Sequence, residues 1–143
     1  MKAFSTFSRV LPLLLLLAAP VLAQEPVGQR VQVPGGAYWD VTPQQLQGML
    51  QQKSFPLINV HIPFQGDIPL TDRSIAFDQI LANLNQLPAD KNAPVVLYCR
   101  SGAMSITAAT QLAGQGYTRI YNLAGGMRAW TTAGFPMADA PAR

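Results

Sequence analysis

The stretch VVLYCRSGAMSITAATQL, residues 95–112, decides the fold because it combines three local patterns in direct succession. It begins with a β-branched, apolar run at residues 95–98, which is typical of a buried strand. A short segment containing Gly102 follows, and apolar residues then recur at helical spacing as far as Leu112. The sequence therefore predicts a strand, a sharp loop and a helix, with Cys99 at the point where the strand ends.

The same alternation of strands and helices extends on both sides of this stretch. Short, bounded apolar runs indicate strands, and apolar residues three and four apart indicate helices. We expect strands at residues 38–41, 57–60, 95–98 and 120–123, and helices at residues 43–53, 77–87, 105–112 and 126–130. This pattern is typical of an α/β protein whose mostly parallel sheet is covered by helices on both faces. Sites in such sheets form at the carboxyl ends of strands, where Cys99 lies.

The first 23 residues have the pattern of a secretory signal peptide. Lys2 and Arg9 give a positive start, an apolar run covers residues 10–22, and small residues surround a cleavage point after Ala23. The alternative is an uncleaved membrane anchor, but the apolar run is shorter than the roughly 20 residues that span a bilayer. We therefore expect residues 1–23 to be removed and the protein to be exported, either periplasmic or secreted, without stable membrane insertion afterwards.

The remainder of the chain has the length of one domain. Residues 24–36 are polar and show no hydrophobic period, so we interpret them as a flexible N-terminal arm. Residues 37–137 form the expected domain, and residues 138–143 form a short C-terminal tail. Within the domain, residues 61–74 are rich in proline and polar residues and predict a long loop, of a kind that often carries function.

Charge and cysteine content narrow the classes of function. Without Lys2 and Arg9, eight basic residues face seven acidic ones, so the net charge of +3 gives no reason to expect a nucleic acid partner. The chain has one cysteine and cannot form an internal disulfide. In an exported protein a lone cysteine is either a buried, inert side chain or a reactive thiol.

The residues around Cys99 favour the reactive alternative. Loop amides and the start of a helix stabilise an anion, and a thiolate there can have its pKa lowered from about 8.5 to about 3.5–7.5. Arg100 adds positive charge, Gly102 permits a tight curve, and Ser101 and Ser105 can donate hydrogen bonds. This chemistry requires neither a metal nor a cofactor.

Several segments in a fixed order resemble the single-domain rhodanese-like sulfurtransferase family. They are LINV at residues 57–60, VLYCRSG at 96–102, YNL at 121–123, GGMRAW at 125–130 and GFP at 134–136. The resemblance extends over residues 37–137, nearly all of the chain after the leader. It implies a three-layer α/β fold with a mostly parallel sheet of about five strands.

The resemblance also implies an activity. Cys99 would accept a sulfane sulfur from a small donor, hold it as a persulfide, and pass it to a thiol-type acceptor that is a small molecule or a protein thiol. The loop implied to bind the substrate and the persulfide consists of Arg100, Ser101, Gly102, Ala103, Met104 and Ser105. Arg100 could instead point into solvent.

Two features depart from the common family pattern. The sequence NVH at residues 59–61 replaces a common Asp-Val-Arg, and a longer loop follows, which resembles an exported subgroup. His61 and Asp67 are therefore candidates for the pocket rim, although ordinary structural roles would also explain them. Many members that use thiosulfate have a basic or hydroxyl side chain at the place of Met104, so efficient use of thiosulfate is not expected.

Two other functions remain open at this stage. One is a non-catalytic binding module with the same fold in an envelope or redox pathway. The other is a cysteine phosphatase, which uses a similar strand, loop and helix. That chemistry needs an arginine six residues after the cysteine to clamp phosphoryl oxygens, and Ser105 occupies the position here. The sulfurtransferase hypothesis is therefore preferred.

Overall fold

The computed structural model describes Ala19 and residues 25–139. The predicted signal peptide, residues 1–23, lies outside the described residues except for Ala19, as does most of the predicted tail. No helix in the described part of the chain is both long and apolar enough to cross a membrane.

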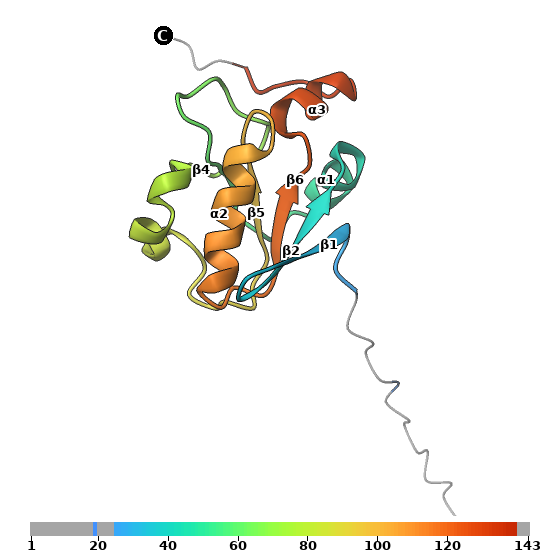
Figure 1. The fold of residues 1–143 in the computed structure, drawn as a ribbon. Coiled ribbons are helices and arrows are strands. Elements are labelled where there is room, and N and C mark those ends of the chain that lie inside the picture. The colour runs from blue at the N-terminus through green and yellow to red at the C-terminus, as the bar shows by residue number, and fades with distance from the viewer. Residues whose placement is uncertain (1–18, 20–24, 140–143) are drawn as a thin grey trace, which may run out of the picture.

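A six-stranded sheet forms the centre of the molecule, with the strands in the order β1-β2-β6-β5-β3-β4 (Figure 1). The strands are β1 (Gln29–Val33), β2 (Gly36–Val41), β3 (Leu57–Asn59), β4 (Arg73–Ser74), β5 (Val95–Tyr98) and β6 (Ile120–Leu123). All neighbouring strands are parallel except β1 and β2. The α/β class is confirmed, with six strands where the sequence analysis expected about five.

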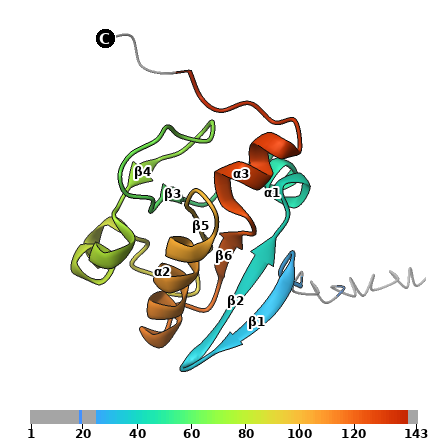
Figure 2. The same ribbon diagram turned by 45° about the horizontal axis from the view of Figure 1, so that its top comes forward.

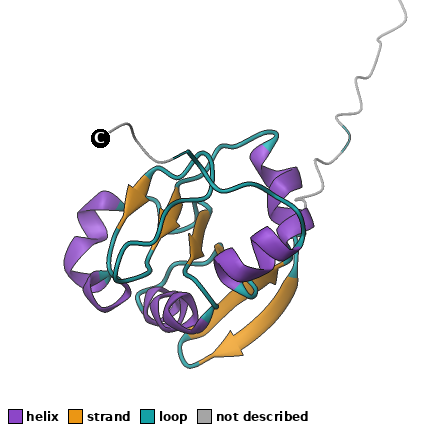
Figure 3. Ribbon diagram, turned by 90° about the horizontal axis from the view of Figure 1, so that it is seen from above, coloured by secondary structure: helices purple, strands orange, loops and turns teal. Residues whose placement is uncertain are grey.

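Helices cover both faces of the sheet (Figures 2 and 3). They are α1 (Pro43–Leu50), α2 (Ala103–Gly114), α3 (Gly126–Thr132) and two 3₁₀ helices, η1 (Phe77–Gln79) and η2 (Leu81–Gln86). The central strand β5 is buried along its whole length and alternates between two cores. Leu97 belongs to the core beneath α2 and the 3₁₀ helices, and Tyr98 to the core beneath α1 and α3. The three-layer prediction is confirmed.

The prediction of a flexible arm at residues 24–36 is wrong for most of that segment. Gln29–Val33 forms strand β1, which pairs antiparallel with β2 through a turn at Gly35, whose φ is 84°. Strand β1 lies at the edge of the sheet, and only Val31 and Val33 are partly buried against the core. With so little apolar surface to bury, an edge strand shows a weak hydrophobic period, and this explains why the pattern resembled an arm.

The helix predicted at residues 77–87 is replaced by the two 3₁₀ segments, with a kink at Asn83 (φ −122°, ψ 27°). The expected apolar face exists, since Ile80, Leu84 and Leu87 pack into the core beneath α2. Residues three apart share a face in both helix types, so apolar spacing alone cannot separate them.

Helix α1 begins at Pro43, as predicted, but ends at Leu50, before the expected residue 53. Thr42 accepts a hydrogen bond from the Gln45 amide at 3.1 Å, and the Gln45 side chain accepts one from the Thr42 amide at 2.9 Å. This reciprocal capping box satisfies two amides that a helix start leaves free. Helix α2 starts at Ala103, two residues before the predicted start, which brings its N-terminus closer to Cys99.

The 61–74 segment is fastened to the sheet at its C-terminal end. Its last residues form β4, which pairs with β3. Asp72 accepts hydrogen bonds from the Leu57 amide at 2.8 Å and from Lys53 at 2.6 Å. Burial acts to raise the pKa of Asp72, but these hydrogen bonds and the nearby positive charges outweigh it and lower the pKa below its usual value.

We predict that Asp72→Ala destabilises the fold by about 1 kcal/mol at neutral pH, because the Leu57 amide and Lys53 lose a charged acceptor. A lowered folded-state pKa means that this stabilisation is present above the unfolded pKa of about 3.9 and is lost as the pH falls through the folded pKa. Urea unfolding at neutral and acidic pH measures the difference, which should shrink in acid. The exposed Asp78→Ala is the charge-matched control, and an equal effect of both substitutions would contradict the assignment.

Candidate active site

The site forms where β5 gives way to α2, at the carboxyl edge of the sheet (Figure 1). Strand β5 is flanked by β6 and β3, so Cys99 lies in the middle of this edge. Gly102 caps α2 with a φ of 105°, a left-handed conformation that glycine adopts without steric cost. This geometry turns the chain sharply enough for the first residues of α2 to face the sulfur.

Two hydrogen-bond donors converge on the sulfur atom of Cys99. The Gly102 amide donates to Sγ at 3.0 Å, and the Ser105 hydroxyl donates to it at 3.4 Å. The Ser105 hydroxyl also lies 3.1 Å from the Gly102 carbonyl oxygen, so its single hydrogen is shared between two acceptors. Cys99 is only 1% exposed and Ser105 is fully buried. The sulfur therefore occupies a closed and polar environment.

These donors shift the acidity of the thiol. Burial on its own raises the pKa of Cys99, because it disfavours the charged form. The Ser105 hydroxyl and the nearby amides of Ser105, Gly102 and Ser101 together outweigh burial, and the pKa is lowered below the ordinary thiol value. The direction agrees with the sequence-based expectation of a stabilised thiolate.

Helix α3 holds the opposite side of the loop. The Met127 amide donates to the Cys99 carbonyl oxygen at 2.9 Å, and the Arg128 amide donates to the Arg100 carbonyl oxygen at 3.0 Å. These two bonds fix the Cys99 and Arg100 carbonyls on the α3 side of the loop. The amide that follows the Arg100 carbonyl, that of Ser101, is among the groups that lower the pKa of Cys99.

Gly126 makes this contact between α3 and the loop sterically feasible. Its φ is 57°, and a Cβ atom at this position would lie 2.3 Å from the Cys99 carbonyl oxygen. The sequence analysis did not identify this role. The signal available was the Gly125-Gly126 pair itself, which a strand-to-helix turn explains equally well from sequence.

Asp67 belongs to a network that ties the long loop to the sheet. Its carboxylate accepts a hydrogen bond from the Asn59 amide group at 2.9 Å and one from the Tyr98 hydroxyl at 3.1 Å. The same hydroxyl accepts a hydrogen bond from the Ile68 amide at 3.0 Å and lies 2.7 Å from the Thr71 hydroxyl. Burial is the main reason that the pKa of Tyr98 is raised, so the phenol keeps its proton. The structure thus places Asp67 as an anchor of the loop.

The same network gives a physical reason for Asn59 at the end of β3. Its amide nitrogen donates to Asp67 and to the Gly66 carbonyl, while its oxygen accepts a hydrogen bond from the His61 amide at 3.0 Å. An aspartate at position 59 could not donate and would set two carboxylates against each other. His61 lies at the start of the loop, with Nε2 3.1 Å from the Gln65 side-chain oxygen, and its Nδ1 atom is buried without a protein partner.

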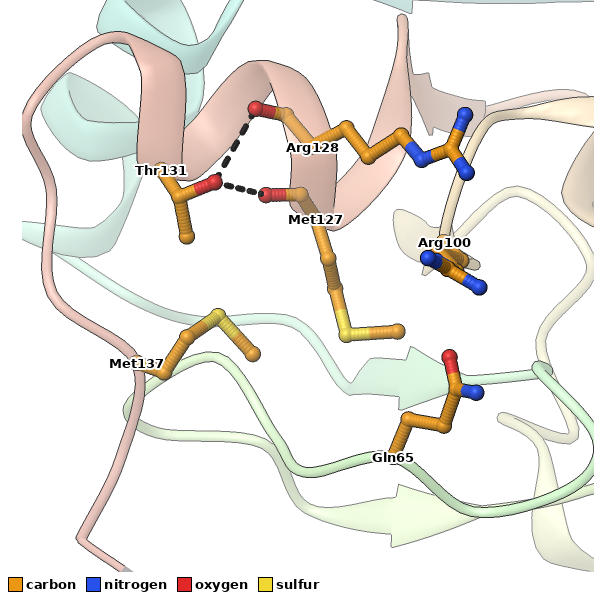
Figure 4. Close-up of a pocket in the computed structure, with 6 residues that line it drawn as sticks. All are labelled: Gln65, Arg100, Met127, Arg128, Thr131 and Met137. Carbon is orange, nitrogen blue, oxygen red and sulfur yellow. Dashed lines mark hydrogen bonds between the residues drawn. The ribbon is translucent and has the colours of Figure 1, made fainter.

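A small pocket lies beside the loop (Figure 4). Its volume is about 210 Å³, and it is lined by Gln65, Arg100, Met127, Arg128, Thr131 and Met137. Arg100 is the member of the predicted loop that faces this pocket. His61 is not among the lining residues and approaches the pocket only through Gln65.

The other predicted loop residues divide into two groups. Ser101, Gly102 and Ser105 direct amides or a hydroxyl toward the sulfur. Ala103 is exposed, and Met104 packs against the core beneath α2, so neither side chain brings charge or hydrogen-bonding capacity to the site. Among the described residues, no group of three or more His, Cys, Asp or Glu side chains is arranged to hold a metal ion.

A comparison of this chain with known protein families agrees with the geometry of the site, in which a loop with a cysteine joins a central strand to a helix. The family model for the rhodanese-like domain matches residues 42–133, which is more than half of the chain. The chain therefore belongs to the rhodanese-like domain family, and the resemblance seen in the sequence is confirmed at this level.

Relatives and solved structures agree with this assignment. A protein named sulfurtransferase from Allochromatium vinosum is 38% identical over 84 residues, covering 57% of this chain and 76% of the relative. The thiosulfate sulfurtransferase GlpE of Actinobacillus succinogenes is 30% identical over 111 residues, covering 73% of this chain and 94% of the relative. The crystal structure of a rhodanese-like domain protein from Staphylococcus aureus superposes with a TM-score of 0.58 at 27% identity, covering 70% of this chain and 98% of that one. These similarities support a transferase of the rhodanese type.

We predict that Ser105→Ala raises the pKa of Cys99, because the variant loses the side-chain hydroxyl that donates to Sγ and favours the thiolate. The pH dependence of alkylation by a small haloacetamide measures this pKa, and its midpoint should move to higher pH in the variant. Ser101→Ala is the matched control, since Ser101 acts through its amide and its side chain is exposed. Equal midpoints for the wild type and Ser105→Ala would contradict the role of the hydroxyl.

We predict that Gly126→Ala destabilises the protein by more than about 2 kcal/mol, because the new methyl group meets the Cys99 carbonyl in a left-handed backbone conformation. Gly134→Ala is the matched control: its φ is 88°, but no atom lies within 4 Å of the added Cβ, so only backbone strain of about 1 kcal/mol is expected. Urea unfolding of both variants measures the contrast. A Gly126→Ala protein as stable as Gly134→Ala would show that the contact is not close.

Proposed function

We propose that this protein is a sulfurtransferase, or sulfane-sulfur carrier, that forms a persulfide on Cys99 and passes the outer sulfur to a thiol-type acceptor. The observation that carries the proposal is the convergence of the Gly102 amide and the Ser105 hydroxyl on a buried sulfur whose pKa is lowered. An inert core cysteine has no use for such donors, since a neutral thiol is a weak acceptor.

The proposed reaction has two displacement steps. The Cys99 thiolate attacks the sulfane sulfur of a donor, a new S–S bond forms, and the donor's leaving group departs with the electron pair of the broken bond. An acceptor thiolate then attacks the outer sulfur of the persulfide, and the electron pair of the Cys99 S–S bond returns to Sγ. The loop donors stabilise negative charge at the start and at the end of this cycle.

The nature of the donor follows from the side chains beside the sulfur. One relative is named a thiosulfate sulfurtransferase, but Met104 packs against the core and offers no charge to a dianion. We therefore propose that position 104 gives thiosulfate no charged partner, so that efficient use of this donor is not supported by that part of the loop. A phosphatase reaction is not favoured, because Ser105 is buried against the sulfur where an arginine clamp would be needed.

The proposed setting is outside the cytoplasm, in the periplasm or as a secreted protein of an exported, longer-loop subgroup. The leader-like pattern of residues 1–23 supports this proposal. The proposed partners are a small sulfur donor and a small or protein thiol, with no nucleic acid and no lasting membrane insertion. A binding module without turnover is the alternative, and it differs in predicting no exchangeable sulfur on Cys99.

We predict that the chain lacking residues 1–23 gains the mass of one sulfur atom when treated with inorganic polysulfide, and that an added thiol removes it. The adduct should localise to Cys99 by peptide mass spectrometry, because the loop donors stabilise the persulfide anion there. Cys99→Ser is the control and should gain nothing. The absence of an adduct on the folded wild type, or an adduct that no thiol removes, would favour the binding module.

A further inference from the structure

The pocket beside the active-site loop carries unneutralised positive charge. Two of its six lining residues are Arg100 and Arg128, both exposed, and none of the six is acidic. Within the described part of the chain, the only salt bridge joins Lys53 and Asp72, so neither guanidinium is paired with a carboxylate. A pocket of this kind attracts a ligand that brings its own negative charge.

The two arginines are held together by the backbone that shapes the active site. The Arg128 amide donates to the Arg100 carbonyl at 3.0 Å, one residue from the equivalent bond between Met127 and Cys99. Figure 4 shows both guanidinium groups on the same side of the pocket, with Gln65 close to Arg100. The positive end of the pocket is therefore fixed next to the peptide that follows the reactive sulfur.

The rest of the pocket is apolar. Met127 is 6% exposed, and Met137 lies opposite it on the chain that leaves α3 (Figure 4). That chain is fixed on both sides of Met137, since Trp130 donates to the Pro136 carbonyl at 2.9 Å and the Ala138 amide donates to the Asp67 carbonyl at 2.8 Å. Methionine side chains supply a soft, polarisable surface suited to carbon and sulfur atoms.

Size and chemistry together point to a small organic ligand. A volume of about 210 Å³ is below the usual range of about 300–1,000 Å³ for drug-sized ligands and admits only a small molecule. A bare inorganic dianion would use the arginines and leave the thioether wall without a partner. A short organic acid, with a charged end and a carbon chain, would use both.

We propose that this pocket binds the acceptor: a small organic thiol that carries a carboxylate or sulfonate. This inference rests on the proposed function. The anionic group pairs with Arg100 and Arg128, and the carbon chain packs on Met127 and Met137. Cys99 does not line the pocket itself, so the thiolate attacks the outer sulfur of the persulfide, which extends one atom beyond the buried Sγ. The acceptor thiolate forms a bond to the outer sulfur, the persulfide S–S bond breaks, and its electron pair returns to Cys99. The products are the acceptor persulfide and the enzyme thiolate, with no further oxidant or reductant.

The test uses four short thiols that share a two-carbon chain and differ in the terminal group. They are mercaptopropionate, mercaptoethanesulfonate, mercaptoethanol and cysteamine. Cys99 is first loaded with sulfur from polysulfide. The removal of that sulfur by each thiol is then followed by mass spectrometry, and the second-order rate constant is expressed per thiolate. Because intrinsic nucleophilicity differs among thiols, each variant is compared with the wild type for the same thiol.

Arg128→Gln should slow transfer to the two anionic thiols about tenfold and change transfer to mercaptoethanol by less than about twofold. Arg128→Lys should restore much of the loss, because it keeps the charge. Arg119→Gln is the matched control: it removes an equal charge just before β6, at the opposite edge of the sheet, and should affect no thiol selectively. The Arg128 side chain is exposed, so these variants should fold.

Three results would overturn the inference while leaving the proposed function intact. In the first, Arg128→Gln slows all four thiols equally, which would make Arg128 a support of the loop. In the second, Arg119→Gln has the same selective effect, which would assign the preference to overall charge. In the third, Arg128→Gln slows loading by thiosulfate as strongly as transfer to mercaptopropionate, which would make this a donor pocket. If polysulfide leaves no persulfide on Cys99, both the function and the inference fail.

Discussion

The structure of the site depends on two donors that meet one buried sulfur. The Gly102 amide and the Ser105 hydroxyl point at Sγ of Cys99, which is almost completely shielded from water. Burial alone would favour the neutral thiol, and only donors in fixed positions can reverse that preference. Three surrounding elements keep these donors in place. They are a central strand that ends at Cys99, a helix that starts a few residues later, and a second helix that packs against the loop.

That second helix links the reactive sulfur to the neighbouring pocket. Met127 and Arg128 use their amides to hold the loop carbonyls, while their side chains line the pocket beside it. Gly126 permits the approach because it has no Cβ atom. One short helix thus fixes the loop backbone at Cys99 and Arg100 and also places a positive charge next to Arg100. The contacts that hold the loop around the sulfur and the pocket proposed to bind the acceptor therefore share helix α3.

The sequence predicted the parts of the fold that depend on local pattern. The buried run of β5 and the sharp loop that follows it at Cys99 could both be read from residue types and spacing. The edge strand β1 could not be predicted in this way, because it buries little apolar surface and so shows a weak hydrophobic pattern. The 3₁₀ geometry of residues 77–87 and the contact at Gly126 are set by tertiary packing. Asp67 looked like a rim residue because a sequence does not show that Asn59 and Tyr98 would enclose it.

The central claim is that the loop donors outweigh burial and lower the pKa of Cys99 below that of a free cysteine. The most direct measurement is a titration of thiolate ultraviolet absorbance for the folded wild type, with Cys99→Ser subtracted as the blank. The account predicts a single titration with a midpoint below the value of about 8.5 for a free cysteine. A midpoint at or above that value, in protein shown to be folded, would mean that burial outweighs the donors, and it would contradict the account.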